Sequence, residues 1–287
     1  MLAVPCRARL SPDEAERIPG IHDALYSDAW EFFEPERAHI PQKTFHMLAE
    51  ILAISAAWAK PDELSPCMRF CVWMYLLDYF VDEQPGITDA HLSTLQQRID
   101  LAMTGLDALE EPRFLEQSLA SILNELAQSP AAPALMSTFR EQIARELAAS
   151  VALHRFDPAQ GMASYLPLAT QCVNHISCCL SLVLALGEPL TTAQGNAVME
   201  VLQPAARAIR LANDLRTHGK DQAEGRPHAL AFDWTEGQVR QEIHHSLEAF
   251  EEGLRASGLP SPTEEGLRRI TRVGVEVYEI TDIKLDL

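Results

Sequence analysis

Apolar residues recur at helical spacing along most of the chain, whereas the alternation typical of strands is nearly absent. No Asn-Gly or Asp-Gly turn separates alternating runs, and β-branched residues are thinly spread. Spacings of three and four residues predict about ten helices. These cover residues 12–29, 42–59, 66–83, 89–104, 113–127, 131–154, 162–186, 193–217, 236–257 and 262–281. The pattern therefore predicts an all-α, antiparallel helical bundle.

Four Ser-Pro pairs mark predicted helix starts, because serine is a favoured N-cap and proline is favoured at the first helical position. They are Ser11-Pro12, Ser65-Pro66, Ser129-Pro130 and Ser261-Pro262. Glu14 and Glu264 lie three residues after their serines, so these two starts are expected to form capping boxes.

The predicted connections are short and carry no bias of an interdomain linker, and no repeat of fixed period is present. We therefore expect one domain over residues 1–287. Segments 66–83 and 162–186 are apolar nearly all round, as expected of helices in the middle of a bundle. Polar groups inside these two segments need a functional or structural reason.

Composition narrows the class of protein. The chain has 287 residues, 47% of them hydrophobic, and a net charge of -18. No run of Lys or Arg could follow a nucleic-acid backbone, so nucleic-acid binding is not expected. An acidic protein that handles an anionic substrate would need bridging cations. The six cysteines are too few and too irregular for a disulfide framework, so buried, reduced thiols are expected.

The chain begins without a basic region followed by an apolar stretch, and no later apolar run looks long enough to span a bilayer. A cytoplasmic location and no membrane span are therefore expected.

A first polar cluster ends one of the two most apolar segments, in the sequence WMYLLDYFVDEQ. Asp78 and Asp82 are four residues apart, which places them on one helical face, and Glu83 follows directly. Two carboxylates at this spacing repel each other near the negative end of the helix dipole. Mg²⁺ would relieve the repulsion, with Glu83 as a further ligand. The alternative is that the acidic residues simply end the helix in solvent.

A second cluster lies in ARAIRLANDLRTHGKD, where Asn213, Thr217 and Asp221 recur every four residues along one stripe. All three are poor helix formers, and together they form a suitable oxygen-ligand set for a hard cation. Arg210 and Lys220 flank the stripe and could hold diphosphate oxygens. The alternative is a surface helix with mixed polar residues.

These two clusters resemble the motifs of class I terpene synthases. LLDYFVDE is similar to their aspartate-rich motif, and NDLRTHGKD is similar to their NSE motif, (N/D)Dxx(S/T)xxx(E/D). The order and separation of the motifs also match, and the resemblance covers essentially the whole chain. The segment SYLPLATQCVNHISCCLSLVLALG resembles the helix that breaks beside the diphosphate in this family, and its CCLSL run is similar to bacterial diterpene synthases of the ent-kaurene synthase type.

Three positions depart from the family pattern. Tyr79 stands where the motif has its second Asp. No Arg occurs near Ala169 or Thr170, where the family has its diphosphate-sensing Arg, which leaves Arg210 or Arg155 for that role. The C-terminal Arg-Tyr pair is reduced to Tyr278, which the resemblance makes a diphosphate-binding candidate.

The resemblance implies an enzyme in which three Mg²⁺ ions connect the two motifs to a prenyl diphosphate, which is ionised and then cyclised or rearranged. Tyr75 and Tyr79 become candidates for stabilising the carbocation, and Cys172 and His175 for lining the cavity near the helix break. Core packing is the more ordinary explanation of the aromatic side chains and of His175. A C20 substrate such as copalyl or geranylgeranyl diphosphate is expected, with farnesyl diphosphate and a sesquiterpene product as the alternative.

Other readings predict different features. A chain-elongating prenyltransferase would need two aspartate-rich motifs, and this chain has one. A non-catalytic helical scaffold or partner-binding protein would show no effect of divalent metal on stability. No DxDD motif occurs, so a bicyclic substrate would have to come from a separate class II cyclase. A homodimer is also left open.

Overall fold

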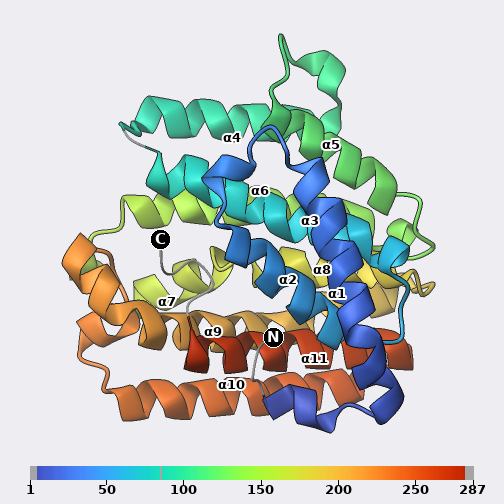
Figure 1. Cartoon of the computed structure of the whole chain (residues 1–287). Coiled ribbons are helices and arrows are strands. Elements are labelled where there is room, and N and C mark those ends of the chain that lie inside the picture. The colour runs from blue at the N-terminus through green and yellow to red at the C-terminus, as the bar shows by residue number, and fades with distance from the viewer. Residues whose placement is uncertain (1–4, 85, 282–287) are drawn as a thin grey trace.

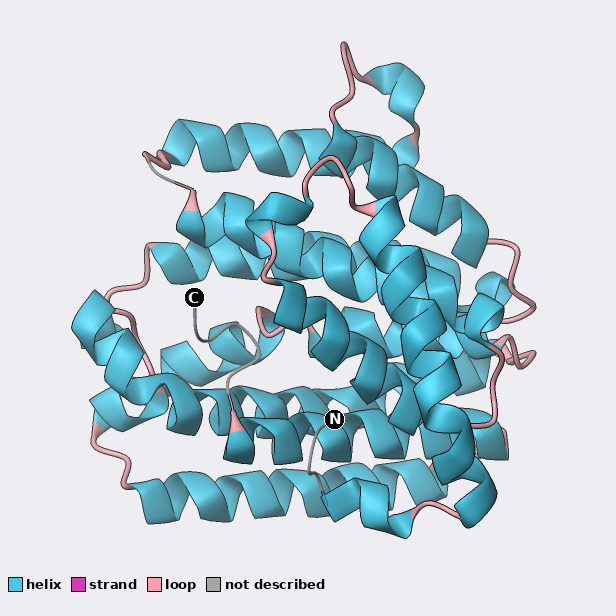
Figure 2. Cartoon of the chain, viewed as in Figure 1, coloured by secondary structure: helices cyan, strands magenta, loops and turns pink. Residues whose placement is uncertain are grey.

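The computed structural model describes residues 5–84 and 86–281, and within these ranges it contains helices and connecting loops but no strand (Figures 1 and 2). The α-helices are α1 (Pro12–Phe32), α2 (Gln42–Ser55), α3 (Pro61–Asp78), α4 (Asp89–Thr104), α5 (Phe114–Leu126), α6 (Ala132–His154), α7 (Met162–Gln171), α8 (His175–Leu186), α9 (Thr192–Glu224), α10 (Glu236–Ala256) and α11 (Ser261–Ile280). A π-helical turn, η3 (Tyr79–Glu83), continues α3. Short 3-10 helices cover Pro5–Arg9, Arg37–His39, Leu106–Ala108, Pro158–Gln160 and Ala229–Phe232. The all-α prediction is confirmed.

The Ser-Pro pairs mark helix starts unevenly. At Ser11 the predicted capping box with Glu14 is present. α3 begins earlier than predicted, at Pro61, because Pro61 already follows an extended residue and takes the first helical position. Ser65 then lies inside the helix, and its hydroxyl donates to the carbonyl of Pro61.

The other two predicted starts also differ. α6 begins at Ala132, and Ser129 accepts the N–H of Ala131 in the preceding turn. The capping box at Ser261 is absent, because Ser261 is itself the first helical residue and Glu264 pairs with Arg268.

The segment predicted as one helix over 162–186 is two helices, which is why α-helices outnumber the prediction by one. The chain turns between Gln171 and His175, where Asn174 adopts a left-handed backbone conformation with φ of 61°. By contrast, α9 is longer than predicted. It continues past Gly219 and stops at Gly225, whose positive φ ends the last turn.

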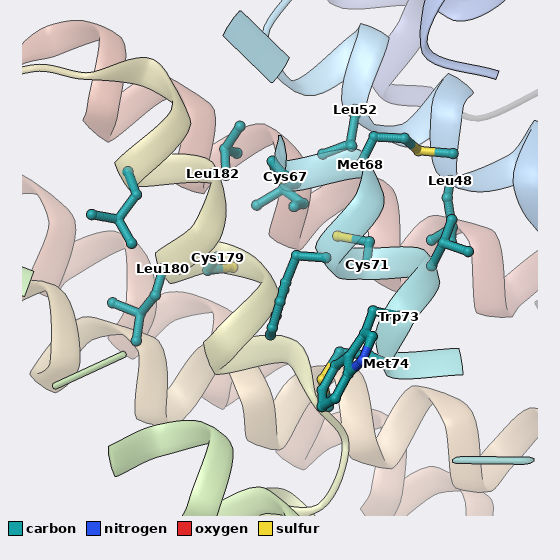
Figure 3. Packing of buried hydrophobic residues seen from close by; sticks show 14 of the residues in the cluster. Leu48, Leu52, Cys67, Met68, Cys71, Trp73, Met74, Cys179, Leu180 and Leu182 are labelled. Carbon is teal, nitrogen blue, oxygen red and sulfur yellow. The ribbon is translucent and has the colours of Figure 1, made fainter. Parts of the chain in front are cut away.

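α3 and α8 lie in the middle of the bundle, as their all-round apolar character predicted. α3 packs against α1, α2, α5 and α8, while α9 packs against α8, α10 and α11. Figure 1 shows α4 and α5 along one side of the molecule and α9, α10 and α11 along the other. In Figure 3, side chains of α3 meet those of α2 and α8, with Cys71 and Cys179 among them. The expectation of one domain over 1–287 stays a prediction.

The expectation that no apolar run reaches spanning length needs one correction. Within the described residues, Met162–Leu186 is long and apolar enough to cross a bilayer by length and composition alone. However, 67% of its most apolar window is buried inside the protein, as in the core helix of a bundle, and the chain breaks within it at Asn174.

Candidate active site

A cavity of about 450 Å³ lies between α2, α3, α6, α8, α9 and α11, and it contains the two polar clusters predicted from the sequence. Its volume falls in the range of about 300–1,000 Å³ that is usual for small-molecule sites. Leu48, Ile51 and Leu52 of α2 contribute apolar walls, and Ile270 of α11 contributes another. The cavity can therefore hold a ligand that has an apolar part as well as a polar one.

α3 presents one side to this cavity, and that side changes from apolar to acidic along the helix. Cys71, Met74 and Tyr75 line the cavity first, and Asp78 and Asp82 follow. Asp82 lies in the π-helical turn η3, which closes with a bond from the N–H of Gln84 to the carbonyl of Tyr79. π-Turns inside helices are rare and frequently mark functional sites.

The break between α7 and α8 reaches the first aspartate directly. The side-chain amide of Asn174 donates a hydrogen bond of 3.2 Å to Oδ1 of Asp78. Cys172, Val173 and His175 at the same break also line the cavity. Residues 96 positions apart in the sequence thus meet at the acidic end of α3.

α9 contributes the second cluster in the predicted stripe. Asn213, Thr217 and Asp221 all line the cavity, one turn after Ile209. The hydroxyl of Thr217 lies 2.9 Å from the carbonyl oxygen of Asn213 and 2.5 Å from Oδ2 of Asp221. The structure therefore brings five of the six residues predicted as metal ligands to one cavity, and the sixth is Glu83.

Arg210 lines the cavity, and two side chains that do not line it hold its guanidinium in place. Its Nη2 lies 2.7 Å from Oδ1 of Asp214 and donates to the hydroxyl of Tyr165, also at 2.7 Å. Asp214 is fully buried and accepts the Tyr165 hydroxyl and the N–H of Ala229. Burial opposes the positive charge, but Asp214 and Tyr165 hold the pKa of Arg210 well above its usual value. The cation is thus both charged and oriented.

The other predicted site residues are mostly at the cavity too. Lys220, Tyr278, Tyr75, Cys172 and His175 line it. Burial lowers the pKa of His175 to about 4, so its imidazole is neutral at physiological pH, and its Nε2 lies 3.1 Å from Oγ1 of Thr271. Burial raises the pKa of Cys172 to about 12, so this residue is a thiol rather than a thiolate.

Tyr79 was wrongly predicted to line the cavity. Its ring instead stacks on His39, with ring centroids 4.4 Å apart, and it is not among the residues that line the cavity. One residue beyond Asp78, the helix has rotated away from the cavity, and among the described side chains of the π-turn that of Asp82 lines it. Arg155 is also placed elsewhere, since it pairs with Asp89 at 2.7 Å. The side chain of Glu83 lies outside the residues that the structure describes.

Some cavity residues were not predicted. His154 lies at 4.0 Å from Oδ1 of Asp82, and Arg226 lines the cavity just after the end of α9. Neither carries a signal in the sequence, because the last residue of α6 and a residue just after α9 reach the site only through tertiary structure. Behind the cavity, Glu146 of α6 is fully buried, and burial raises its pKa to about 7. The sequence does indicate that Glu146 is buried, because it continues the apolar stripe of Leu135 and Phe139.

The oxygen atoms at the cavity suit a hard divalent cation. Carboxylate, amide and hydroxyl groups come from two helices, and no thiolate competes, because the cavity thiols have raised pKa values. Within the described residues, no three His, Cys, Asp or Glu side chains lie close enough to hold a metal ion by themselves. Mg²⁺ does not require them to, because it commonly takes one or two carboxylates and completes its shell with water and phosphate oxygens.

Comparison with known proteins identifies the fold and the family. The model of the family described as terpene synthase family 2, C-terminal metal binding, matches residues 69–231, which is more than half of the chain and includes both polar clusters. No curated protein matches the chain in sequence.

Solved structures of similar shape include terpene synthases. Linalool/nerolidol synthase from Streptomyces clavuligerus, in complex with 2-fluorogeranyl diphosphate, is 17% identical with a TM-score of 0.70, covering 98% of this chain and 99% of its own. A variant of cucumene synthase is 15% identical with a TM-score of 0.69, covering 93% and 96%. Hedycaryol synthase in complex with HEPES is 17% identical with a TM-score of 0.63, covering 90% and 91%. At these identities the likeness shows the fold alone.

Proposed function

Because this chain belongs to terpene synthase family 2, whose members are class I terpene synthases with a divalent-metal site, we propose that it ionises a prenyl diphosphate with Mg²⁺ and then cyclises or rearranges the carbocation. The observation that carries the proposal is the convergence of two oxygen-rich clusters on one cavity that also has apolar walls. Asp78 and Asp82 reach it from α3 and its π-turn, and Asn213, Thr217 and Asp221 reach it from α9.

The five oxygen-bearing residues would hold the metal ions. The family resemblance implies three Mg²⁺ ions. When bound, Mg²⁺ neutralises the diphosphate and stabilises it as a leaving group while the carbon–oxygen bond breaks. Arg210 contributes a fixed positive charge toward the same oxygens, and Lys220, Arg226 and Tyr278 add donors at the cavity wall. Asp214 and Tyr165 keep the Arg210 guanidinium in place, so its position needs little reorganisation during the reaction.

The remaining walls would protect the carbocation. Leu48, Leu52, Met74 and Ile270 exclude water from the apolar part of the cavity, and Tyr75 offers an aromatic ring worth about 0.5–2 kcal/mol in cation–π stabilisation. His175, with a pKa lowered to about 4 by burial, stays neutral and so does not repel the cation.

The length of the substrate is the finer part of the proposal. A C20 substrate was predicted from the partial resemblance to diterpene synthases. The comparisons do not show this finer resemblance. A C15 substrate is supported by the modest cavity volume of about 450 Å³. We therefore propose that the chain accepts farnesyl diphosphate, with geranylgeranyl and copalyl diphosphates as the second candidates. The homodimer, the upstream class II cyclase and the cytoplasmic location stay predictions.

The direct test incubates the purified protein with Mg²⁺ and, separately, geranyl, farnesyl, geranylgeranyl and copalyl diphosphates, followed by mass-spectrometric analysis of the organic extract. We expect a hydrocarbon or terpene alcohol from at least one substrate, and none when the metal is chelated. Release of no terpenoid product from any of the four would overturn the cyclase assignment. A scaffold would in addition show no change in melting temperature with Mg²⁺ and diphosphate.

A further inference from the structure

The helix that follows the break at the cavity begins without a cap from its own residues. Asn174 is the residue before α8, and asparagine at this position commonly accepts an N–H of the first turn. Here Asn174 has a positive φ of 61° and makes no such hydrogen bond. Its amide instead donates to Oδ1 of Asp78, at 3.2 Å. The first-turn N–H groups of α8 therefore need other acceptors.

Glu146 supplies one of these acceptors from a different helix. Its Oε1 accepts the N–H of Ser177, in the first turn of α8, at 3.1 Å. The same oxygen accepts Nε2 of Gln142 at 2.9 Å, which fixes the carboxyl group within α6. An acidic group is favoured at this position, because the N-terminal end of a helix carries a partial positive charge.

The cap comes at a cost that fold stability alone does not explain. Glu146 is fully buried, its Oε2 has no hydrogen-bond partner among the described residues, and no Lys or Arg pairs with it. An unpaired buried carboxyl is unfavourable. A cap supplied by Asn174 itself would have avoided this burial, but the Asn174 amide would then have been drawn away from Asp78.

We propose that Glu146 is a positioning residue for the metal-binding end of α3. By capping α8 from α6, it holds the break so that Asn174 can keep the carboxyl group of Asp78 directed toward the cavity. The inference rests on the proposed function, because it takes Asp78 as a metal ligand. Glu146 itself touches neither metal nor substrate and does not line the cavity.

The test compares Glu146→Ala with Glu146→Gln. Glutamine has nearly the same shape and keeps an oxygen that can accept the N–H groups of Ser177 and Gln142, whereas alanine leaves both without an acceptor. Titration calorimetry would measure the apparent Kd for Mg²⁺ in the presence of inorganic diphosphate, which needs no organic substrate. We expect Glu146→Ala to raise this Kd by about tenfold or more, as removal of outer-shell partners commonly does. Glu146→Gln should stay within about twofold of the wild type.

Glu116 provides a matched control. It is also a buried glutamate at a helix start, where it accepts the N–H of Arg113 before α5 at 2.6 Å and pairs with Arg98 at 2.6 Å. It does not line the cavity. Glu116→Ala should therefore lower the melting temperature and leave the Kd for Mg²⁺ with diphosphate unchanged, so it separates lost stability from lost positioning.

The outcomes distinguish the inference from the proposed function. A rise in Kd for Glu146→Ala, recovery in Glu146→Gln and no rise in Glu116→Ala support the positioning role. If the wild type binds Mg²⁺ with diphosphate and Glu146→Ala binds it equally well, the inference fails and the function stands. If the wild type binds no Mg²⁺ with diphosphate, both fail. Circular dichroism at 222 nm checks that each variant keeps its helices.

Discussion

The amide of Asn174 donates a hydrogen bond to the carboxylate of Asp78 across 3.2 Å, and so joins the break between α7 and α8 to the acidic end of α3. Asn174 is one of three non-glycine residues with positive φ among those that the structure describes. Asparagine tolerates this conformation better than most residues. The strained backbone and the contact with Asp78 therefore occur in the same residue, at the wall of the cavity.

Asn174→Gly should separate these two features. Glycine adopts φ of 61° without steric cost, so the break should persist, while the hydrogen bond to Asp78 is lost. A hydrogen bond to a charged group is worth about 1.5–3 kcal/mol, so we expect at least a tenfold rise in the Mg²⁺ concentration that gives half-maximal turnover. Turnover rates at a series of Mg²⁺ concentrations measure this. An unchanged metal requirement would show that Asp78 does not depend on the contact.

The pH dependence of stability should reverse sign between two variants. Burial lowers the pKa of His175 from 6.5 to about 4, so its contribution is present above pH 6.5 and is lost as the pH falls toward 4. Burial raises the pKa of Glu146 from 4.5 to about 7, so its contribution is present at low pH and is lost as the pH rises through 7. Each shift corresponds to about 3 kcal/mol, so the two offset each other in the wild type.

Urea unfolding at pH 7.5 and pH 5 measures this difference. Relative to the wild type, His175→Gln should gain about 2 kcal/mol of unfolding free energy on acidification, because only the Glu146 contribution remains. Glu146→Gln should lose a similar amount, because only the His175 contribution remains. Parallel pH profiles in all three proteins would contradict the shifted pKa values.

Tyr165→Phe tests whether the Arg210 guanidinium must be held by its hydrogen bond to the Tyr165 hydroxyl. The variant removes the hydroxyl that Arg210 and Asp214 share, which should cost about 1–3 kcal/mol of stability because Asp214 is fully buried and the Arg210 side chain is mostly buried. Tyr165 does not line the cavity, so any rise in KM for the diphosphate substrate must act through Arg210. We expect KM to rise more than kcat falls. Tyr26→Phe removes a surface hydroxyl bonded to Gln42 and should leave KM unchanged.

Much of the fold and of the candidate site could be predicted from the sequence, and the wrong predictions have local causes. Apolar periodicity placed the helices because burial of one stripe dominates their stability, and the two motifs located the metal-ligand candidates. The π-turn at Tyr79–Glu83 was not readable, because LLDYFVDE has ordinary helical spacing. Tyr79 was misplaced for a different reason, since it follows Asp78 by one residue and so lies off the helical face that lines the cavity. The contacts of Glu146, Tyr165 and His154 join distant segments, which a single sequence does not specify.

Gly274→Ala should narrow the cavity from α11. A Cβ atom at Gly274 would lie 2.7 Å from Cδ1 of Ile209, so the end of the Ile209 side chain must move. Both residues line the cavity, and the displacement should reduce its volume. We expect the ratio of turnover on C20 to turnover on C15 diphosphates to fall, as measured by product yield.

Gly20→Ala in α1 is the control for this variant. Nothing lies within 4 Å of a Cβ atom built there, so it should add up to about 1 kcal/mol of helix stability and leave the substrate ratio unchanged. Equal substrate ratios in Gly274→Ala and the wild type would show that this wall does not limit substrate length.

The central claim is that residues of α3 and α9 bind metal ions around one diphosphate. Crystals grown with Mn²⁺ and inorganic diphosphate, measured at the manganese absorption edge, test it most directly. We predict anomalous peaks from manganese ions at the cavity. Some of these ions should be bound by oxygen atoms of Asp78 or Asp82, and others by oxygen atoms of Asn213, Thr217 and Asp221. The diphosphate should lie between the two groups. Manganese and diphosphate bound elsewhere on the protein, with the cavity filled only by water, would contradict the account.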